Sequence, residues 1–309
     1  MESPRQLLGV DIGGTKTALI AGNSAGDVFG RVEFPTLPEK GYLGWLSRAA
    51  QAWRNLQAVA PEWRPAAGGI SVGGPADWGA GVLLNPPNLP GWDGVPVRED
   101  LAGAFGLPFA IEHDGRAGAL AEHQFGAGRG VDNLVFLTFG TGIGAGIIIG
   151  GRLYRGASGA SGELGHVRMD TRGPRAYNKT GSFEAFASGG GIAKLAALRF
   201  PARWPSDPTA REIIELAGSG DTDALAVLDE SADALGRGMG LLADILNPEL
   251  IILGSLASRL NERYHERALA SMRSEALPGN FDACRVVVSA LGERLQDLAA
   301  LMAAVHGCR

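Results

Sequence analysis

Short apolar runs separated by glycine turns open the chain. The turns Gly-Gly-Thr-Lys and Gly-Asn-Ser-Ala-Gly-Asp separate three of these runs, which predict adjacent antiparallel strands at 7–12, 17–21 and 28–34. Over 42–59, apolar residues recur instead at three- and four-residue spacing, which is the pattern of an amphipathic helix. The chain therefore begins as a three-stranded meander followed by a helix.

Strand-like and helix-like segments then alternate along the rest of the chain. Strands are predicted at 69–72, 108–112, 134–139, 143–149, 250–253 and 286–288. Helices are predicted at 97–105, 115–125, 213–216, 224–246, 261–276 and 294–306. This alternation predicts an α/β protein in two lobes. The apolar pair at 134–149, with its own glycine turn, repeats the opening hairpin and suggests two related halves.

Composition narrows the classes of function. The chain has 309 residues, enough for about two domains, and its 45% hydrophobic and 20% charged residues are close to the soluble globular average. A net charge of −5 without a long basic run argues against nucleic acid or an anionic membrane surface as a partner. Cys284 and Cys308 fit neither a disulfide framework nor a metal motif, and no leader pattern precedes Asp11, so we expect a cytoplasmic protein.

Glycine is unusually abundant, with 47 residues and no Gly-X-Y period. Such glycines are expected where backbone turns tightly or approaches another group. In the first loop, Gly13 and Gly14 allow backbone N–H groups to converge on phosphate oxygens. Thr15 adds a hydroxyl donor and Lys16 a positive charge, while Asp11 could hold Mg²⁺ through water. A plain hairpin with a charged tip explains the same residues.

A second glycine loop contains Thr141 and Gly142. It follows another predicted strand and lacks the following helix that a dinucleotide-binding fold requires. Two such loops in one chain favour a nucleotide held between lobes.

Five segments, taken in their order along the chain, resemble the ROK family of sugar kinases and repressors. The matching segments are 11–17, Glu112-His113-Asp114, 138–146, Gly162-Glu163-Leu164-Gly165-His166 and 247–254. The resemblance implies the actin-like ATPase fold, which is ribonuclease H-like, with mixed sheets and an interlobe cleft for ATP and a hexose. The expected lobes are 1–112, completed by the helix at 293–309, and 113–292. The resemblance also implies a homodimer or a larger homo-oligomer.

The resemblance assigns roles to single residues. Asp114 falls where the family keeps its catalytic base, since a carboxylate there can accept the proton of a sugar hydroxyl that attacks the γ-phosphoryl group. A helix N-cap is the other explanation of Asp114. The implied sugar-binding residues are Gly74, Asn88, His113, Glu163, His166 and Glu184. The implied ATP and phosphate residues are Asp11, Gly13, Gly14, Thr15, Lys16, Thr141, Gly142 and Gly254. A structural histidine and a surface charge are the alternatives for His166 and Glu163.

Two positions depart from the family pattern. Many members follow the Gly-His pair with cysteines that bind a structural zinc, whereas 174–184 contains no cysteine. We therefore expect no zinc, with Tyr177 and Phe183 as hydrophobic anchors in its place. His113 stands where the kinases usually have asparagine, and imidazole is larger and titrates near neutrality. A ring that reshapes the sugar site and a ring turned away from the ligand both remain open.

The sequence thus predicts a sugar kinase that uses ATP with Mg²⁺ and has Asp114 as general base. The expected substrate is a hexose or N-acylhexosamine, glucose-like, phosphorylated at the 6-hydroxyl. A catalytically silent sugar-binding or regulatory ROK protein without a DNA-binding domain is the alternative. A repressor is disfavoured, because only six residues precede Leu7 and the charge balance is acidic. Neither nucleic acid nor a membrane is expected as a partner.

Overall fold

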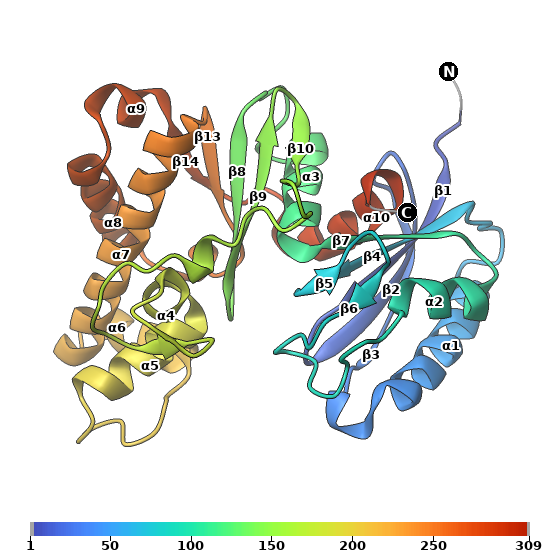
Figure 1. Ribbon diagram of the computed structural model, residues 1–309, viewed down its shortest axis with the longest axis horizontal. Coiled ribbons are helices and arrows are strands. Elements are labelled where there is room, and N and C mark those ends of the chain that lie inside the picture. Colours follow the sequence, from blue (N-terminus) through green and yellow to red (C-terminus); the bar gives the residue numbers. More distant parts are fainter. Residues whose placement is uncertain (1–2, 308–309) are drawn as a thin grey trace. The chain divides into compact units, whose positions relative to one another are not determined.

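The computed structural model describes residues 3–307, which form two compact units (Figure 1). Unit 1 contains the chain up to Phe125, the short segment Gly156–Gly159 and the chain from Leu291 onward. Unit 2 contains Gly126–Arg155 and Ala160–Ala290. Each unit is built on its own five-stranded sheet. Cys308 lies outside the described residues.

The sheet of unit 1 has the strand order β3-β2-β1-β4-β7. Its strands are β1 (Gln6–Ile12), β2 (Lys16–Asn23), β3 (Val28–Pro35), β4 (Ala67–Val72) and β7 (Phe109–His113). The first three strands are antiparallel, which confirms the predicted meander, and β4 and β7 continue the sheet in parallel with β1. A small hairpin of β5 (Ala76–Asp77) and β6 (Val82–Leu83), which the sequence pattern did not predict, follows β4.

Helices cover both faces of this sheet. They are α1 (Tyr42–Val59), α2 (Val97–Phe105), α3 (Asp114–Phe125) and α10 (Leu295–His306). Leu8, Val10 and Ile12 alternate along β1 onto the face where they join the core with Trp45 of α1. The opposite face packs on α10, where a β-carbon on Gly69 would lie 2.0 Å from the backbone nitrogen of Ala304, so only glycine permits this approach. Because α3 packs on α10, unit 1 extends past residue 112, the boundary expected from the sequence.

The sheet of unit 2 repeats this arrangement, with the order β10-β9-β8-β13-β14. Its strands are β8 (Leu134–Phe139), β9 (Ile143–Ile149), β10 (Arg152–Tyr154), β13 (Leu250–Leu253) and β14 (Arg285–Val288). Here too an antiparallel meander is extended by two parallel strands. Two sheets with one topology are what the repeated glycine hairpin predicted.

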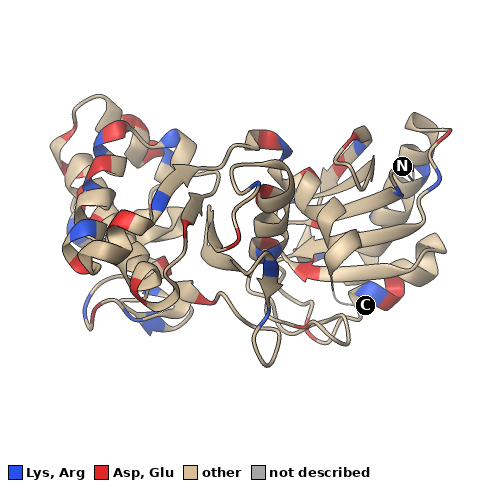
Figure 2. Ribbon diagram, turned by 90° about the horizontal axis from the view of Figure 1, so that it is seen from above, with Lys and Arg blue, Asp and Glu red and all other residues tan. Residues whose placement is uncertain are grey.

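Unit 2 carries most of the helices. They are α4 (Phe183–Ala187), α5 (Gly189–Arg199), α6 (Ala210–Gly218), α7 (Thr222–Leu246), α8 (Glu262–Glu275) and α9 (Pro278–Ala283). Asp221 caps α7 by accepting the N–H of Ala224, and Asn247 ends it in the left-handed conformation. Acidic and basic residues are interspersed on these helices (Figure 2), and Arg267 of α8 pairs with Asp233 of α7. Among the described residues, no helix is both long and apolar enough to cross a membrane.

Candidate active site

Strand β7 runs into helix α3 without an intervening loop, at His113 and Asp114. Asp114 is the first residue of α3, and its Oδ1 accepts the N–H of Gly115 at 2.6 Å. The Asp114 side chain is nevertheless 49% exposed. Its carboxylate therefore stabilises the start of the helix while its free face remains open to a ligand.

A pocket of unit 1 is lined by several residues that the sequence analysis predicted to form the site. It is lined by Ile12, Gly13, Gly14, Gly73, Gly74, Pro86, Asn88, Leu89 and Asp114. Five of these residues were predicted site residues: Gly13, Gly14, Gly74, Asn88 and Asp114. The first glycine loop, the loop after β4 and the start of α3 thus meet around one carboxylate.

Asp11 is a second carboxylate near this pocket. It lies in register with Ser71 across β1 and β4, and the Ser71 side chain hydrogen bonds to it. Burial first, and then the negative charge of Asp114, raise the pKa of Asp11 to about 7, although the bond from Ser71 opposes this shift. The two carboxylates repel each other, so a cation beside them would be stabilised.

These oxygen donors suit Mg²⁺, which prefers hard ligands and keeps several of its water molecules. The described residues contain no group of three or more acidic, histidine or cysteine side chains that could enclose a metal by themselves. A Mg²⁺ held through water by Asp11, with phosphate oxygens as further ligands, fits this donor set because it requires no protein cage.

The tip of the first glycine loop is held differently from the sequence-based expectation. The N–H of Gly13 donates to the carbonyl of Lys16 at 3.0 Å, which closes the turn. Lys16 Nζ lies 2.9 Å from Glu33 Oε2 and lowers the pKa of that carboxyl, and neither Thr15 nor Lys16 lines the pocket. To reach a phosphate, Lys16 must leave Glu33.

In unit 2, the second glycine loop is tied to Glu184. Glu184 Oε2 accepts the N–H of Ile143 at 3.0 Å, and a β-carbon on Gly142 would lie 2.7 Å from the same oxygen. Burial raises the pKa of Glu184, the Ile143 N–H and Lys194 oppose the rise, and the charge of Glu163 adds to it. The two glutamates predicted to bind sugar therefore lie close enough to interact, and one of them also supports the loop with Thr141 and Gly142.

The start of α5 supports the same loop, and the sequence analysis missed this. The N–H of Gly189 donates to the carbonyl of Gly140 at 2.7 Å, and that of Gly190 to the carbonyl of Thr141 at 2.9 Å. Ser188 caps the helix by accepting the N–H of Gly191. A serine followed by three glycines at a helix start was the available signal, because side chains there would block the loop.

His166 lies in the short 3₁₀ turn Leu164–His166. Its ring stacks on Tyr177 with centroids 5.2 Å apart, and Lys179 Nζ donates to its carbonyl oxygen. Phe183 is fully buried in the core of unit 2. Tyr177 contacts the histidine but is 44% exposed, so of the two expected anchors only Phe183 is buried; the absence of zinc stays a prediction.

Gly254 follows β13, and its N–H donates to the carbonyl of Leu137 at 2.9 Å. It therefore stands at the carboxyl end of a parallel strand, where α/β sheets commonly bind ligands.

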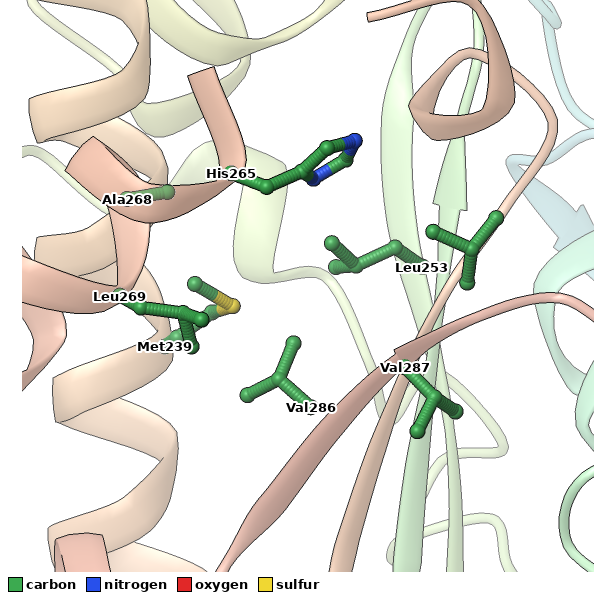
Figure 3. Close-up of a pocket in the computed structure, with 8 residues that line it drawn as sticks. Met239, Leu253, His265, Ala268, Leu269, Val286 and Val287 are labelled. Carbon is green, nitrogen blue, oxygen red and sulfur yellow. The ribbon is translucent and has the colours of Figure 1, made fainter. Parts of the chain in front are cut away.

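A separate pocket of about 190 Å³ lies between α7, α8 and strands β13 and β14 (Figure 3). Its lining is mostly aliphatic, with His265 at one side, and it contains none of the predicted site residues.

His113 is fixed by its neighbours in unit 1. Its Nδ1 shares the N–H of Gly115 with Asp114 Oδ1, at 3.1 and 2.6 Å, and lies 3.3 Å from that carboxylate oxygen. Its ring meets the ring of Trp78 edge to face, with centroids 5.6 Å apart. Beside it, Arg116 and Glu112 form a buried ion pair at 2.5 Å, which the sequence analysis also missed.

Comparison with known proteins identifies the family of the chain. The model of the ROK family matches residues 7–305, almost the whole chain. The chain belongs to the ROK family. A glucokinase from Thermotoga maritima is 35% identical over 268 residues, which are 83% of this chain and 84% of that enzyme.

Solved ROK structures share the fold. The ROK hexokinase from Thermus thermophilus superposes with a TM-score of 0.84 at 32% identity, over 97% of this chain and 98% of that one. A ROK glucokinase from Streptomyces griseus, in complex with glucose and AMPPNP, has a TM-score of 0.82 at 29% identity, over 98% of this chain and all of that one. The ROK chain described here therefore has the α/β actin-like ATPase fold with mixed sheets, as predicted.

Proposed function

We propose that this protein, a sugar kinase of the ROK family, transfers the γ-phosphoryl group of ATP to the 6-hydroxyl of a glucose-like hexose or N-acylhexosamine. The observation that carries the proposal is the pocket of unit 1, in which a half-exposed Asp114 carboxylate lies among two glycine stretches and Asn88. The glucokinase and hexokinase relatives support a sugar as acceptor, and the AMPPNP in the Streptomyces griseus complex supports ATP as donor.

Asp114 acts as general base in this proposal. Its carboxylate accepts the proton of the sugar hydroxyl while the hydroxyl oxygen attacks the γ-phosphorus and the bond to ADP breaks. The hydrogen bond from Gly115 holds one carboxylate oxygen and leaves the other for the hydroxyl. Mg²⁺, held through water by Asp11, neutralises phosphate charge when it is bound.

The glycine loops bind phosphate through backbone N–H groups. In unit 1 Gly14 supplies such a group, while Gly13, whose N–H closes the turn on Lys16, shapes the loop; in unit 2 Thr141 and Gly142 supply them. Thr15 adds a hydroxyl, Lys16 leaves Glu33 for the phosphates, and Gly254 lies beside the adenosine.

The hydroxyls of the sugar are bound by fixed donors and acceptors. Glu163, His166 and Glu184 carry this role in unit 2, and Gly74, Asn88 and His113 carry it in unit 1. Such groups discriminate between sugars because a missing hydroxyl leaves a buried partner unpaired. The stack of Tyr177 on His166 supports a ring held in one orientation.

A coupled assay of ADP release over glucose, mannose, fructose, allose, N-acetylglucosamine and N-acetylmannosamine tests this function. We expect ADP release that depends on Mg²⁺ and on one or two of these sugars, with the 6-phosphate as product. Sugar binding without turnover on the whole panel would instead support the catalytically silent protein, which His113 in place of the usual asparagine keeps as a second candidate.

We also propose that the enzyme works in the cytoplasm as a homodimer or larger homo-oligomer, with sugar and ATP as its ligands and without nucleic acid or a membrane as partner. The net charge of −5 supports the last point. Light scattering of the purified protein measures the oligomer, and a monomer at micromolar concentration would contradict it.

A further inference from the structure

A buried ion pair joins Glu112 and Arg116, which lie two residues before and two residues after the proposed base Asp114. Arg116 is 1% exposed and Glu112 is fully buried, and Arg116 Nε donates to Glu112 Oε1 at 2.5 Å. Glu112 lies near the end of β7 and Arg116 lies in the first turn of α3, so they flank Asp114 on either side. The same Glu112 oxygen accepts the N–H of His113 at 3.0 Å. The ion pair therefore fixes the backbone of the strand–helix junction on which Asp114 stands.

The same guanidinium holds a segment from another part of the chain. Arg116 Nη1 donates to the carbonyl of Gly159 at 2.5 Å, and its Cζ lies 4.7 Å from the centre of the Trp78 ring. Gly159 packs against that ring, because a β-carbon on it would lie 3.3 Å from Trp78 Cδ1. The segment Gly156–Gly159 belongs to unit 1, although the chain before and after it belongs to unit 2.

The net stability of the ion pair is not sufficient to explain this cluster. A buried ion pair contributes little net stability, since the loss of hydration offsets the attraction between the charges. In addition, Arg116 Nη2 is buried and has no hydrogen-bond partner among the described residues, which costs free energy. The further contacts of the guanidinium, to Gly159 and Trp78, bind a segment far along the chain, which points to a role in placing that segment.

We propose that Arg116 is a positioning residue for phosphoryl transfer, which clamps Gly156–Gly159 to the junction that carries Asp114. Glu163 follows Gly159 by four residues, and a stretch of that length spans at most about 14 Å. The clamp therefore fixes one end of the segment that leads to Glu163. This inference rests on the proposed function, in which Glu163 binds a sugar hydroxyl.

Arg116→Met tests the clamp, since methionine keeps an unbranched side chain but lacks the guanidinium group. We expect the KM for the sugar to rise about 10- to 100-fold and the KM for ATP to stay within about twofold, because the sugar-binding group is displaced. Amide hydrogen exchange over 156–163 should become faster without any ligand. If the methionine variant does not fold, Arg116→Lys takes its place, because lysine keeps the charge beside Glu112 but does not reach Gly159. The sugar KM and the exchange rate over 156–163 should then rise in the same way.

Trp63→Phe is the matched control. Trp63 is a buried residue of the same unit whose Nε1 donates to the carbonyl of Gly22 at 3.2 Å. Its loss removes a buried hydrogen bond far along the chain from the β7–α3 junction. We expect a lower melting temperature with unchanged sugar KM and unchanged exchange over 156–163.

The double variant Glu112→Gln with Arg116→Met separates positioning from charge compensation. It leaves no unpaired buried charge, and the carbonyl oxygen of the introduced glutamine can still accept the His113 N–H. We expect thermal stability to recover while the sugar KM stays high. Recovery of both, or an Arg116→Met protein with normal sugar KM and normal exchange, would overturn the clamp. A wild-type protein inactive on every hexose would reject the proposed function, whereas the exchange experiment still decides the clamp.

Discussion

Gly14 lies directly against Asn88: a β-carbon built on Gly14 would be 2.7 Å from the Asn88 carbonyl oxygen. Gly14 belongs to the loop assigned to phosphate, and Asn88 to the loop assigned to sugar. Both line the pocket that contains Asp114. Within unit 1, the two loops therefore fix each other's position by backbone contact, and a side chain at residue 14 would force them apart.

Gly14→Ala should impair catalysis while the protein still folds. The nearest atom is a backbone oxygen, which cannot rotate away, so the loops must shift by a fraction of an ångström or more. We expect kcat/KM to fall about 100-fold, in line with the effect of small misplacements in active sites. Gly103→Ala is the control, because no atom lies within 4 Å of the added β-carbon in α2 and helix propensity there favours alanine by about 1 kcal/mol. Equal activities of the two variants would contradict the contact.

Asp114→Asn should remove the proton acceptor with little change in shape. Loss of general-base catalysis lowers kcat by about 10²–10⁴-fold, whereas ATP binding should be largely spared. Turnover by coupled assay and ATP affinity by calorimetry measure the two effects. Asp282→Asn, on an exposed position of α9, serves as the control for a lost carboxylate. Near-normal turnover of the Asp114 variant would remove the base assignment.

Asp11→Asn should stabilise the free protein at high pH. The folded-state pKa of about 7 lies above the ordinary value of 3.8, so ionisation of Asp11 costs the folded state free energy as the pH rises between these values. The cost is complete above pH 7 and reaches on the order of 4 kcal/mol. We expect a higher melting temperature of the variant at pH 8 and an equal one near pH 4, in chelator without ligand. A pH-independent difference would show that burial does not raise this pKa.

His113→Asn should change the choice of sugar more than the rate. In the structure, His113 Nδ1 is engaged by the Gly115 N–H and lies 3.3 Å from Asp114 Oδ1, so the ring has only Nε2 for a further partner, whereas asparagine offers both a donor and an acceptor. We expect the ratios of kcat/KM among the hexoses to change about tenfold or more, with kcat on the best sugar retained. Unchanged ratios would mean that the ring is turned away from the ligand.

The purified protein should contain no stoichiometric zinc by elemental analysis, because residues 174–184 offer no thiolate. Chelator treatment followed by added Mg²⁺ should leave activity unchanged. One zinc per chain would contradict this expectation.

Tyr177→Ala should raise the sugar KM about tenfold, since His166 loses the ring on which it stacks. Tyr154→Ala, at an exposed tyrosine of unit 2, provides the control.

The local sequence pattern predicted most elements but not all of their limits. The helix expected at 213–216 extends over Ala210–Gly218, because Thr209 caps it by accepting the N–H of Glu212. The helix expected from 115 starts at Asp114. The short hairpin of β11 (Arg175–Ala176) and β12 (Lys179–Thr180) was missed, since two-residue strands carry too little alternation to be recognised.

The sequence by itself determined the α/β class, the two glycine loops, the position of Asp114 after a strand and the membership of the ROK family. Periodicity, turn chemistry and the order of motifs along the chain are local properties, so they can be read without a structure. Only the tertiary structure decided that burial, and then Asp114, raise the pKa of Asp11, that Glu184 holds the second glycine loop and that Arg116 is buried on Gly159. These relations join residues that are distant in sequence and depend on burial, which the fold alone sets.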